Sequence, residues 1–113
     1  MNRSKAKGTW WETACVRWLE QFIPGVRRKV LAGSADEGDL TWGAGAVVVE
    51  CKNVGSLAVP AWVREAEAEA VNAGARYGVV LYKVRGKGQV ADGVVAMSPE
   101  TFVRLVKEAG LDS

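Results

Sequence analysis

The sequence predicts an α/β fold, arranged as a three-layer sandwich in which helices flank a central mixed β-sheet. Two observations predict it. Apolar residues recur at helical spacing near the N-terminus, and short β-branched runs alternate with helix-forming stretches through the rest of the chain. The expected order is helix, three strands, helix, strand, strand and helix. With 113 residues, 49% of them hydrophobic, the chain can bury one core, so we expect a single domain spanning residues 1–113.

The first element is a predicted helix from Trp10 to Phe22. At about 100° per residue its apolar side chains fill one continuous sector, which indicates a face turned toward the core. Pro24-Gly25 marks its end. Glu12 falls inside the apolar sector, where a carboxylate needs a partner. An alternative is a capping box, in which Glu12 reaches back to Thr9 at the start of the helix.

The remaining elements follow from β-branched runs, turn residues and helix-start signals. Pro60 suits the first turn of a helix and Gly74 suits its exit, while Ser98-Pro99 opens a last helix that ends near Gly110. The predicted strands cover residues 26–32, 39–42, 46–52, 77–83 and 93–97, and the second helix covers residues 60–72.

The composition excludes several kinds of site. The chain has no histidine, which removes serine–histidine catalysis, zinc sites that use imidazole, and nucleases with a histidine base. Cys15 and Cys51 lie in apolar patterns without metal-ligand spacing, so we expect reduced core thiols. No apolar run reaches the roughly 20 residues of a membrane span, so we expect a cytoplasmic protein with no membrane partner.

Basic residues are concentrated in the first third of the chain. The formal net charge is only +2, but Glu12 and Glu20 are the only acidic residues before position 30. Such a segment suits contacts with phosphates, although a solvated basic face without a partner explains it equally well. The basic residues of this segment are Arg3, Lys5, Lys7, Arg17, Arg27, Arg28 and Lys29.

The sharpest chemical signal is the pair Glu50 and Lys52. Strand side chains alternate, so both point to one face of a buried strand. A plain ion pair at the strand end would explain them equally well. Asp39 opens the preceding strand, and the turn between the two strands lets Asp39 and Glu50 meet. Converging carboxylates repel each other and are ready ligands for a hard divalent cation, although Asp39 after Gly38 could simply belong to a turn.

Asp39, a turn, and then Glu50-Cys51-Lys52 resemble the split Asp…Glu-X-Lys motif of the PD-(D/E)XK nucleases. Within that superfamily, the helix with Glu12, the basic first strand and the Gly33-Ser34 loop are similar to the archaeal and phage Holliday junction resolvases. The likeness spans about residues 7–83. It implies a restriction-endonuclease-like fold and an endonuclease that depends on Mg²⁺ or Mn²⁺. Gly38 stands where the family often has a proline.

The resemblance also implies a role for each matching residue. Asp39 and Glu50 would bind the metal together with the backbone carbonyl of Cys51, and Glu12 would assist directly or through water. Lys52 would orient or deprotonate the attacking water and stabilise charge on the phosphate. The second helix, where relatives place glutamine or tyrosine, offers three glutamates to which we assign no catalytic role: Glu65, Glu67 and Glu69.

The expected substrate is branched DNA, in particular a four-way junction cut by paired nicks. The compact chain has no added recognition domain, so DNA shape is the expected object of recognition. A nicking or trimming nuclease with another DNA target, and a non-catalytic DNA-binding module of the same fold, are the alternatives. Ser34 would reach the scissile region from its loop. The expected DNA contacts are Lys5, Lys7, Arg27, Arg28, Lys29, Lys83, Arg85 and Lys87.

Paired nicks require two active sites, so we expect a homodimer with twofold symmetry. Its expected surface is the second helix with its approach, where apolar residues gather. These residues could instead complete the core of the single chain. They are Leu57, Val59, Trp62 and Val63. Trp10 and Trp62 could also stack on exposed bases, although aromatic residues at helical spacing more often belong to a core.

Overall fold

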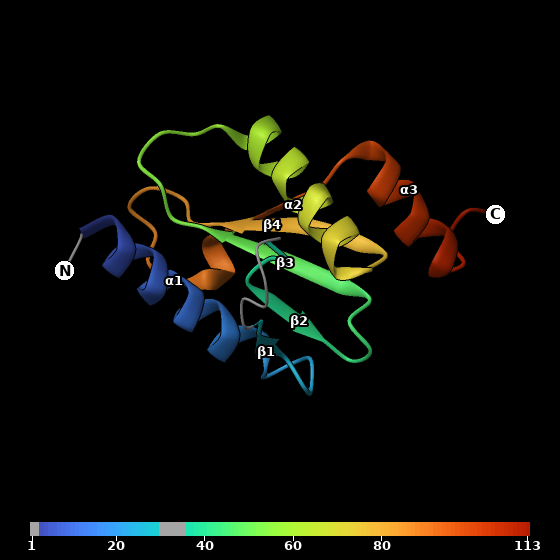
Figure 1. Cartoon of the computed structure of the whole chain (residues 1–113), viewed down its shortest axis with the longest axis horizontal. Helices are drawn as coiled ribbons and strands as arrows, with labels where there is room; N and C mark the ends of the chain where they lie inside the picture. Colours follow the sequence, from blue (N-terminus) through green and yellow to red (C-terminus); the bar gives the residue numbers. More distant parts are fainter. Residues whose placement is uncertain (1–2, 30–35) are drawn as a thin grey trace.

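A five-stranded mixed β-sheet forms the centre of the computed structural model, which describes residues 3–29 and 36–113 (Figure 1). The strand order is β1-β2-β3-β4-β5, with β3 and β4 parallel and every other neighbouring pair antiparallel. The predicted α/β class, mixed sheet and order of elements are confirmed. The elements are α1 (Arg3–Leu19), β1 (Arg27–Arg28), β2 (Leu40–Trp42), β3 (Val47–Lys52), α2 (Val59–Ala73), β4 (Tyr77–Tyr82), the 3₁₀ turn η1 (Val90–Asp92), β5 (Val94–Ala96) and α3 (Pro99–Glu108).

The first helix begins earlier than the sequence predicts. α1 passes through Gly8 and Thr9 without a break, so Thr9 is not an N-cap and the capping box with Glu12 is wrong. Glu12 instead pairs with Arg28 of β1, 3.3 Å away. Phe22 lies beyond the helix and is 64% exposed. A single glycine costs a helix only about 1 kcal/mol, which the packing of the following turns outweighs.

α1 covers one face of the sheet and forms the larger core with it. Trp11 and Cys15 are fully buried against Leu40 and Val49. The indole N–H of Trp11 donates to the carbonyl of Leu81 at 3.1 Å, which ties α1 to the end of β4. A buried indole N–H needs such a partner, so this bond fixes the depth of the helix.

α2 covers the opposite face, so the layers are compatible with a three-layer sandwich. Trp62, only 7% exposed, packs with Ala66 and Val80, and its ring meets the ring of Tyr82 edge-on at 5.5 Å. A Cβ atom on Gly78 would lie 2.3 Å from the carbonyl oxygen of Ala66, so only glycine lets α2 rest directly on β4.

Trp62 therefore belongs to the core of the single chain, and its predicted place in a dimer surface is wrong. Val59 and Val63 pack against the same core and are half-buried. Of the four residues expected in that surface, only Leu57 is largely exposed. The apolar residues that the sequence pattern placed in a dimer surface instead pack between α2 and β4.

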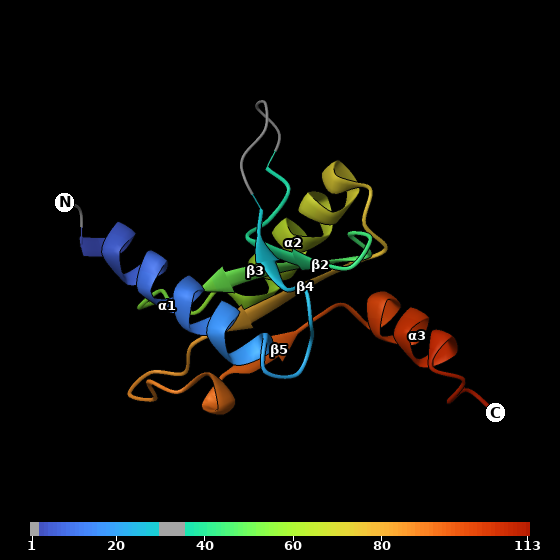
Figure 2. The ribbon, with the colours of Figure 1, turned by 90° about the horizontal axis from the view of Figure 1, so that it is seen from below.

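α3 lies at the end of the molecule opposite α1, beyond the edge strand β5 (Figure 2). Ser98 caps it by accepting the N–H of Thr101 at 3.1 Å, and Pro99 occupies its first turn, as predicted. The hydroxyl of Ser98 also donates to Glu67 of α2 at 2.7 Å. Glu67 thus has a structural partner at the start of α3. Within residues 3–29 and 36–113, no helix has the length and apolarity of a transmembrane span.

Candidate metal centre

Asp39 lies where the backbone pairing of β2 with β3 ends. Its N–H donates to the carbonyl of Val49 at 3.1 Å, but the N–H of Cys51 donates to Oδ2 of the Asp39 side chain at 2.8 Å. The carboxylate therefore takes the place of a strand partner and sits beside Glu50. Burial raises the pKa of Asp39, although the Cys51 N–H and the Glu50 carboxyl partly offset this. The structure brings Asp39 and Glu50 together, as their strand positions predict.

Glu50 points to the α2 face of the sheet and is only 7% exposed. Burial, a hydrogen bond that the protonated form shares with Glu69, and the charge of Asp39 raise its pKa to about 10. Its Oε2 atom is buried and has no donor among the residues that the structure describes. A buried carboxylate without a donor is costly, and a bound cation would remove that cost.

Lys52 lies on the same face as Glu50, as alternation along the strand predicts. Its ammonium is 3.6 Å from Oε1 of Glu50 and 3.1 Å from Oε1 of Glu65. Burial by itself would lower the pKa of Lys52, but the hydrogen bond to Glu65 and the charges of both glutamates outweigh it and raise the pKa. Lys52 is therefore a fixed positive charge, suited to orienting a water or a phosphate oxygen rather than to accepting a proton.

Two glutamates of α2 join this centre, although the sequence pattern had given them no role. Glu65 and Glu69 are four residues apart, so they project from the same side of the helix. Glu69 is 2% exposed, and when Glu50 and Glu69 are both ionised neither carboxylate oxygen of Glu69 has a donor within the described part of the chain. Burial raises its pKa to about 7, a hydrogen bond with Glu50 opposes that shift, and the charge of Asp36 adds to it.

Asp36 comes to the centre from the loop before β2. Its Oδ1 accepts the N–H of Gly38 at 2.9 Å, and its carbonyl accepts a hydrogen bond from Asn72 of α2 at 2.8 Å. Gly38 has φ +89°, and a Cβ there would lie 2.2 Å from Cγ1 of Val48. Only glycine lets this loop lie flat on β3. This gives a physical reason for glycine at position 38.

Four carboxylates consequently converge on the α2 face. One oxygen from each lies within 4.8 Å of one from every other: Asp36, Glu50, Glu65 and Glu69. Carboxylate oxygens are the ligands that Mg²⁺ and Mn²⁺ prefer, and no sulfur or imidazole is offered within this group. The unpartnered buried oxygens of Glu50 and Glu69 fit such an ion, because its charge would neutralise them. A divalent-cation site is thus the chemistry that this arrangement suits best.

Glu12 is not among the four. It lies on α1, across the sheet, and Arg28 holds it. Burial and the charge of Asp39 raise its pKa, while Arg28 opposes the shift, so Glu12 and Asp39 are electrostatic neighbours. Its predicted assistance to the metal, directly or through water, stays a prediction, as does the role of the Cys51 carbonyl. Ser34 lies outside the residues that the structure describes.

The residues expected to contact DNA fall into two groups. In the first, Arg28 pairs with Glu12, Lys29 pairs with Glu37 at 3.0 Å, and Arg27 donates to a loop carbonyl. Arg28 and Lys29 therefore already have protein partners. The second group lines or adjoins a pocket beyond the ends of β3 and β4, and consists of Lys7, Lys83, Arg85 and Lys87. The side chain of Lys5 lies outside the described part of the chain.

Comparison of the chain with known protein families, with curated proteins and with solved structures finds no match. The interpretation of the centre accordingly rests on its own geometry: two buried and two exposed carboxylates grouped beside the ammonium of Lys52.

Proposed function

We propose that the protein is a DNA endonuclease of restriction-endonuclease-like fold that requires Mg²⁺ or Mn²⁺ and hydrolyses phosphodiester bonds. The observation that carries this proposal is the grouping of Glu50 and Lys52 on one face, with Asp39 and Glu69 beside them. Unpartnered buried carboxylates favour a cation, and an adjacent ammonium favours an anion. A phosphodiester held between a divalent cation and an ammonium satisfies both.

Each residue of the centre has a distinct task in this proposal. Glu50, with Asp39 on one side and Glu69 on the other, would hold the cation. Such an ion supplies Lewis-acid stabilisation of the charge on the phosphate. Lys52 donates hydrogen bonds to the attacking water or to a phosphate oxygen, and its raised pKa keeps it charged during the reaction. Glu65 holds the Lys52 ammonium in position.

Branched DNA, and a four-way junction in particular, is the substrate that we propose. Nicking or trimming of another DNA structure uses the same centre, and the DNA specificity decides between them. A non-catalytic DNA-binding module is less well supported, because the buried charges of Glu50 and Glu69 would then destabilise the fold without a catalytic gain. A DNA substrate also agrees with the expected cytoplasmic location.

A homodimer stays part of the proposal, but with a different surface. β5 is an edge strand, and exposed apolar side chains gather on it and on α3: Val94, Val95, Phe102 and Val103. A groove of about 880 Å³ is lined by Val95 and Phe102 on one side and by the start of α2 on the other. A second copy related by a twofold axis would pair the two β5 edges and cover Phe102. Light scattering tests this, because Phe102→Glu should convert a dimer into a monomer.

Cleavage assays with labelled four-way junction, flap and duplex test the activity itself. We expect cleavage with Mg²⁺ or Mn²⁺, none in EDTA, and binding without cleavage in Ca²⁺, whose looser coordination misplaces the water. Asp39→Asn, Glu50→Gln and Lys52→Met should each abolish cleavage and leave DNA binding largely intact. Glu67→Gln is the matched control, since Glu67 lies on α2 but faces Ser98. Full activity in EDTA would falsify the metal-dependent mechanism.

A further inference from the structure

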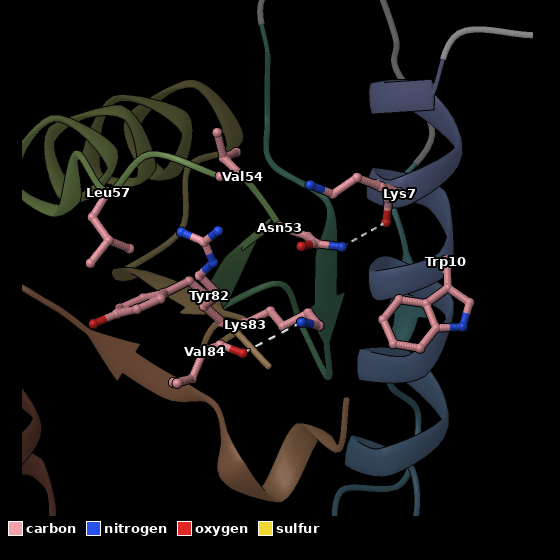
Figure 3. Close-up of a pocket in the computed structure, with 10 residues that line it drawn as sticks. Lys7, Trp10, Asn53, Val54, Leu57, Tyr82, Lys83 and Val84 are labelled. Carbon is pink, nitrogen blue, oxygen red and sulfur yellow. Dashed lines mark hydrogen bonds between the residues drawn. The ribbon is translucent and has the colours of Figure 1, made fainter. Parts of the chain in front are cut away.

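A pocket of about 790 Å³ opens beyond the carboxyl ends of the parallel strands β3 and β4 (Figure 3). Its walls come from three segments that are distant in the sequence: the first half of α1, the loop 53–58 and the loop 83–89. The side-chain amide of Asn53 donates to the carbonyl of Lys7 at 3.3 Å, which joins two of these walls. The volume is within the range of about 300–1,000 Å³ that is usual for small-ligand sites.

The lining of this pocket combines positive charge with one exposed aromatic ring. Lys7, Lys83 and Arg85 supply three cations, and no carboxylate is present among the described residues that line it. Trp10 is 51% exposed, whereas Trp11 and Trp62 are buried in the two cores. Cations beside an accessible aromatic face are the chemistry that binds a nucleotide, by its phosphates and its base.

The pocket lining also contains apolar side chains that a nucleotide base could contact. In Figure 3, Leu57 extends from the loop toward Tyr82, and Val54 stands above them on the same loop. Leu57 is strongly exposed for a leucine, and it gains no cover from the two cores. A base that enters the pocket would cover apolar surface that the protein itself leaves open.

The pocket lies directly beside the metal centre. Asn53 follows Lys52 in the chain, so their Cα atoms are about 3.8 Å apart. The N–H of Lys83 donates to the carbonyl of Lys52 at 2.9 Å, which brings the second basic loop to the same place. A strand whose scissile phosphate meets Lys52 therefore has its neighbouring nucleotide at the mouth of this pocket.

We propose that the pocket takes one unpaired nucleotide of the DNA strand next to the scissile phosphate. The base would stack on Trp10, and the flanking phosphates would pair with Lys83 and Arg85. This inference rests on the proposed nuclease function and names the substrate class more closely. A base within a duplex would first have to leave its stack, which costs a few kcal/mol and costs least when the base is already unpaired. The enzyme therefore favours branched DNA in which the nucleotide at the cut site is unpaired or is easily unpaired at the branch point.

A binding experiment tests the pocket independently of cleavage. The probe is a fluorescein-labelled single-stranded oligodeoxynucleotide of about 12 nucleotides, titrated in Ca²⁺ and followed by anisotropy. Trp10→Ala should weaken binding roughly 5-fold to 150-fold, as expected for the loss of one base stack. Phe22→Ala is the control, since it removes an exposed aromatic residue that does not line the pocket. Unchanged affinity of Trp10→Ala would overturn the proposal.

The cations give a second, separate readout. Arg85→Ala and Lys83→Ala should each reduce the slope of log affinity against log salt by about 0.7, the value for one phosphate contact on a single strand. Arg17→Ala, an exposed change on α1 outside the pocket, should leave the slope unchanged. An equal loss of slope in Arg17→Ala would show a diffuse charge effect and contradict a defined phosphate site.

Cleavage separates this inference from the nuclease proposal. Trp10→Ala should raise KM for a flap or junction with an unpaired nucleotide at the cut site and change kcat little, while KM for a fully paired nicked duplex stays the same. An equal rise in KM on both substrates would overturn the pocket and leave the nuclease intact. If the wild-type protein cleaves no DNA but the binding losses occur as expected, the nuclease proposal fails and the nucleotide pocket stands.

Discussion

Two neighbouring positions of the β2–β3 ladder face opposite sides of the sheet and have opposite chemistry. Leu40 pairs with Val49, and both are buried in the core under α1. One residue further along β3, Glu50 points to the side of α2 and lies beside Asp39, which is just outside the ladder; Glu50 is buried and Asp39 is half-buried. Burial of Leu40 and Val49 stabilises the fold. Burial of Asp39 and Glu50 destabilises it when both are ionised, because the two carboxylates repel each other and favour the protonated state.

The difference shows which face of the sheet stabilises the fold and which face holds groups that destabilise it. The α1 face supplies most of the apolar core, which allows the α2 face to hold four carboxylates close together. A cation would reverse the balance on the α2 face and leave the α1 face unchanged. Mutations on the two faces should accordingly have opposite effects on activity and on folding.

The largest expected effect is on cleavage, at Glu50. Glu50→Gln keeps the shape of the side chain and removes the charge, so cleavage should fall roughly 10³-fold or more, in line with the loss of a metal ligand or charge-stabilising group. The free energy of unfolding in EDTA should stay the same or rise, because the amide does not repel Asp39 or Glu69. Single-turnover cleavage and urea unfolding measure the two effects. A variant that cleaves normally would remove Glu50 from the centre.

On the other face, Leu40→Ala should destabilise the fold by about 2–5 kcal/mol, as expected for truncation of a fully buried leucine. The midpoint of urea unfolding should fall while the slope stays similar. A loss below about 1 kcal/mol would show that this face is packed more loosely than the structure indicates.

Gly38→Ala should destabilise the fold more than Gly25→Ala. Both glycines have positive φ, +89° and +86°, so both alanines share a strain of about 1–2 kcal/mol. Only at Gly38 would the new methyl group also clash, with Val48, whereas nothing lies within 4 Å of the position at Gly25. Thermal unfolding measures both losses of stability, and the difference between them is the contribution of the clash with Val48. Equal losses would mean that the loop can lift from β3, and would remove Asp36 from the centre.

A last expected effect, which depends on pH rather than on a mutation, is on stability in EDTA. Glu50 and Glu69 have pKa values of about 10 and about 7 in the folded protein, both above the ordinary value of 4.5. Below pH 4.5 both states are protonated and the full stability is present. As pH rises, the unfolded chain releases protons that the fold retains, so stability falls between pH 4.5 and 7 and continues to fall toward 10. Calorimetry in EDTA should show Tm falling from pH 5 to 8, and Mg²⁺ should restore it most at pH 8. A Tm that rises over this range in EDTA would contradict the buried carboxylates.

The sequence pattern predicted part of this centre because that part depends on local periodicity. Alternation along β3 is enough to place Glu50 and Lys52 on one face, and a turn between strands is enough to bring Asp39 to them. Glu69 was missed, although the helical pattern contains a signal for it. At about 100° per residue it falls beside Trp62 and Ala66, on the face that meets the sheet.

Other features depend on contacts that no local pattern contains. Asp36 reaches the centre only because its loop lies on β3 and is held by Asn72. Glu12 pairs with Arg28, sixteen residues away in the chain, and a helical wheel of α1 alone cannot show that partner. The early start of α1 was missed because its first turns are polar and contain Gly8, and tertiary packing outweighs such weak propensities.

The contact between Gly78 and Ala66 has a consequence for which ion the centre can hold. No side chain separates α2 from β4 there, so backbone against backbone fixes the height of the helix above the sheet. That height also fixes the distance between the carboxylates of Glu65 and Glu69 on α2 and the carboxylate of Glu50 on β3. Oxygen ligands lie about 2.0–2.1 Å from Mg²⁺ and about 2.3–2.6 Å from Ca²⁺, so a shift of a few tenths of an ångström changes the preferred ion. Gly78 is not one of the carboxylates, but by fixing the height of α2 it would set the size of the cation site and therefore the ionic radius that the carboxylates accept.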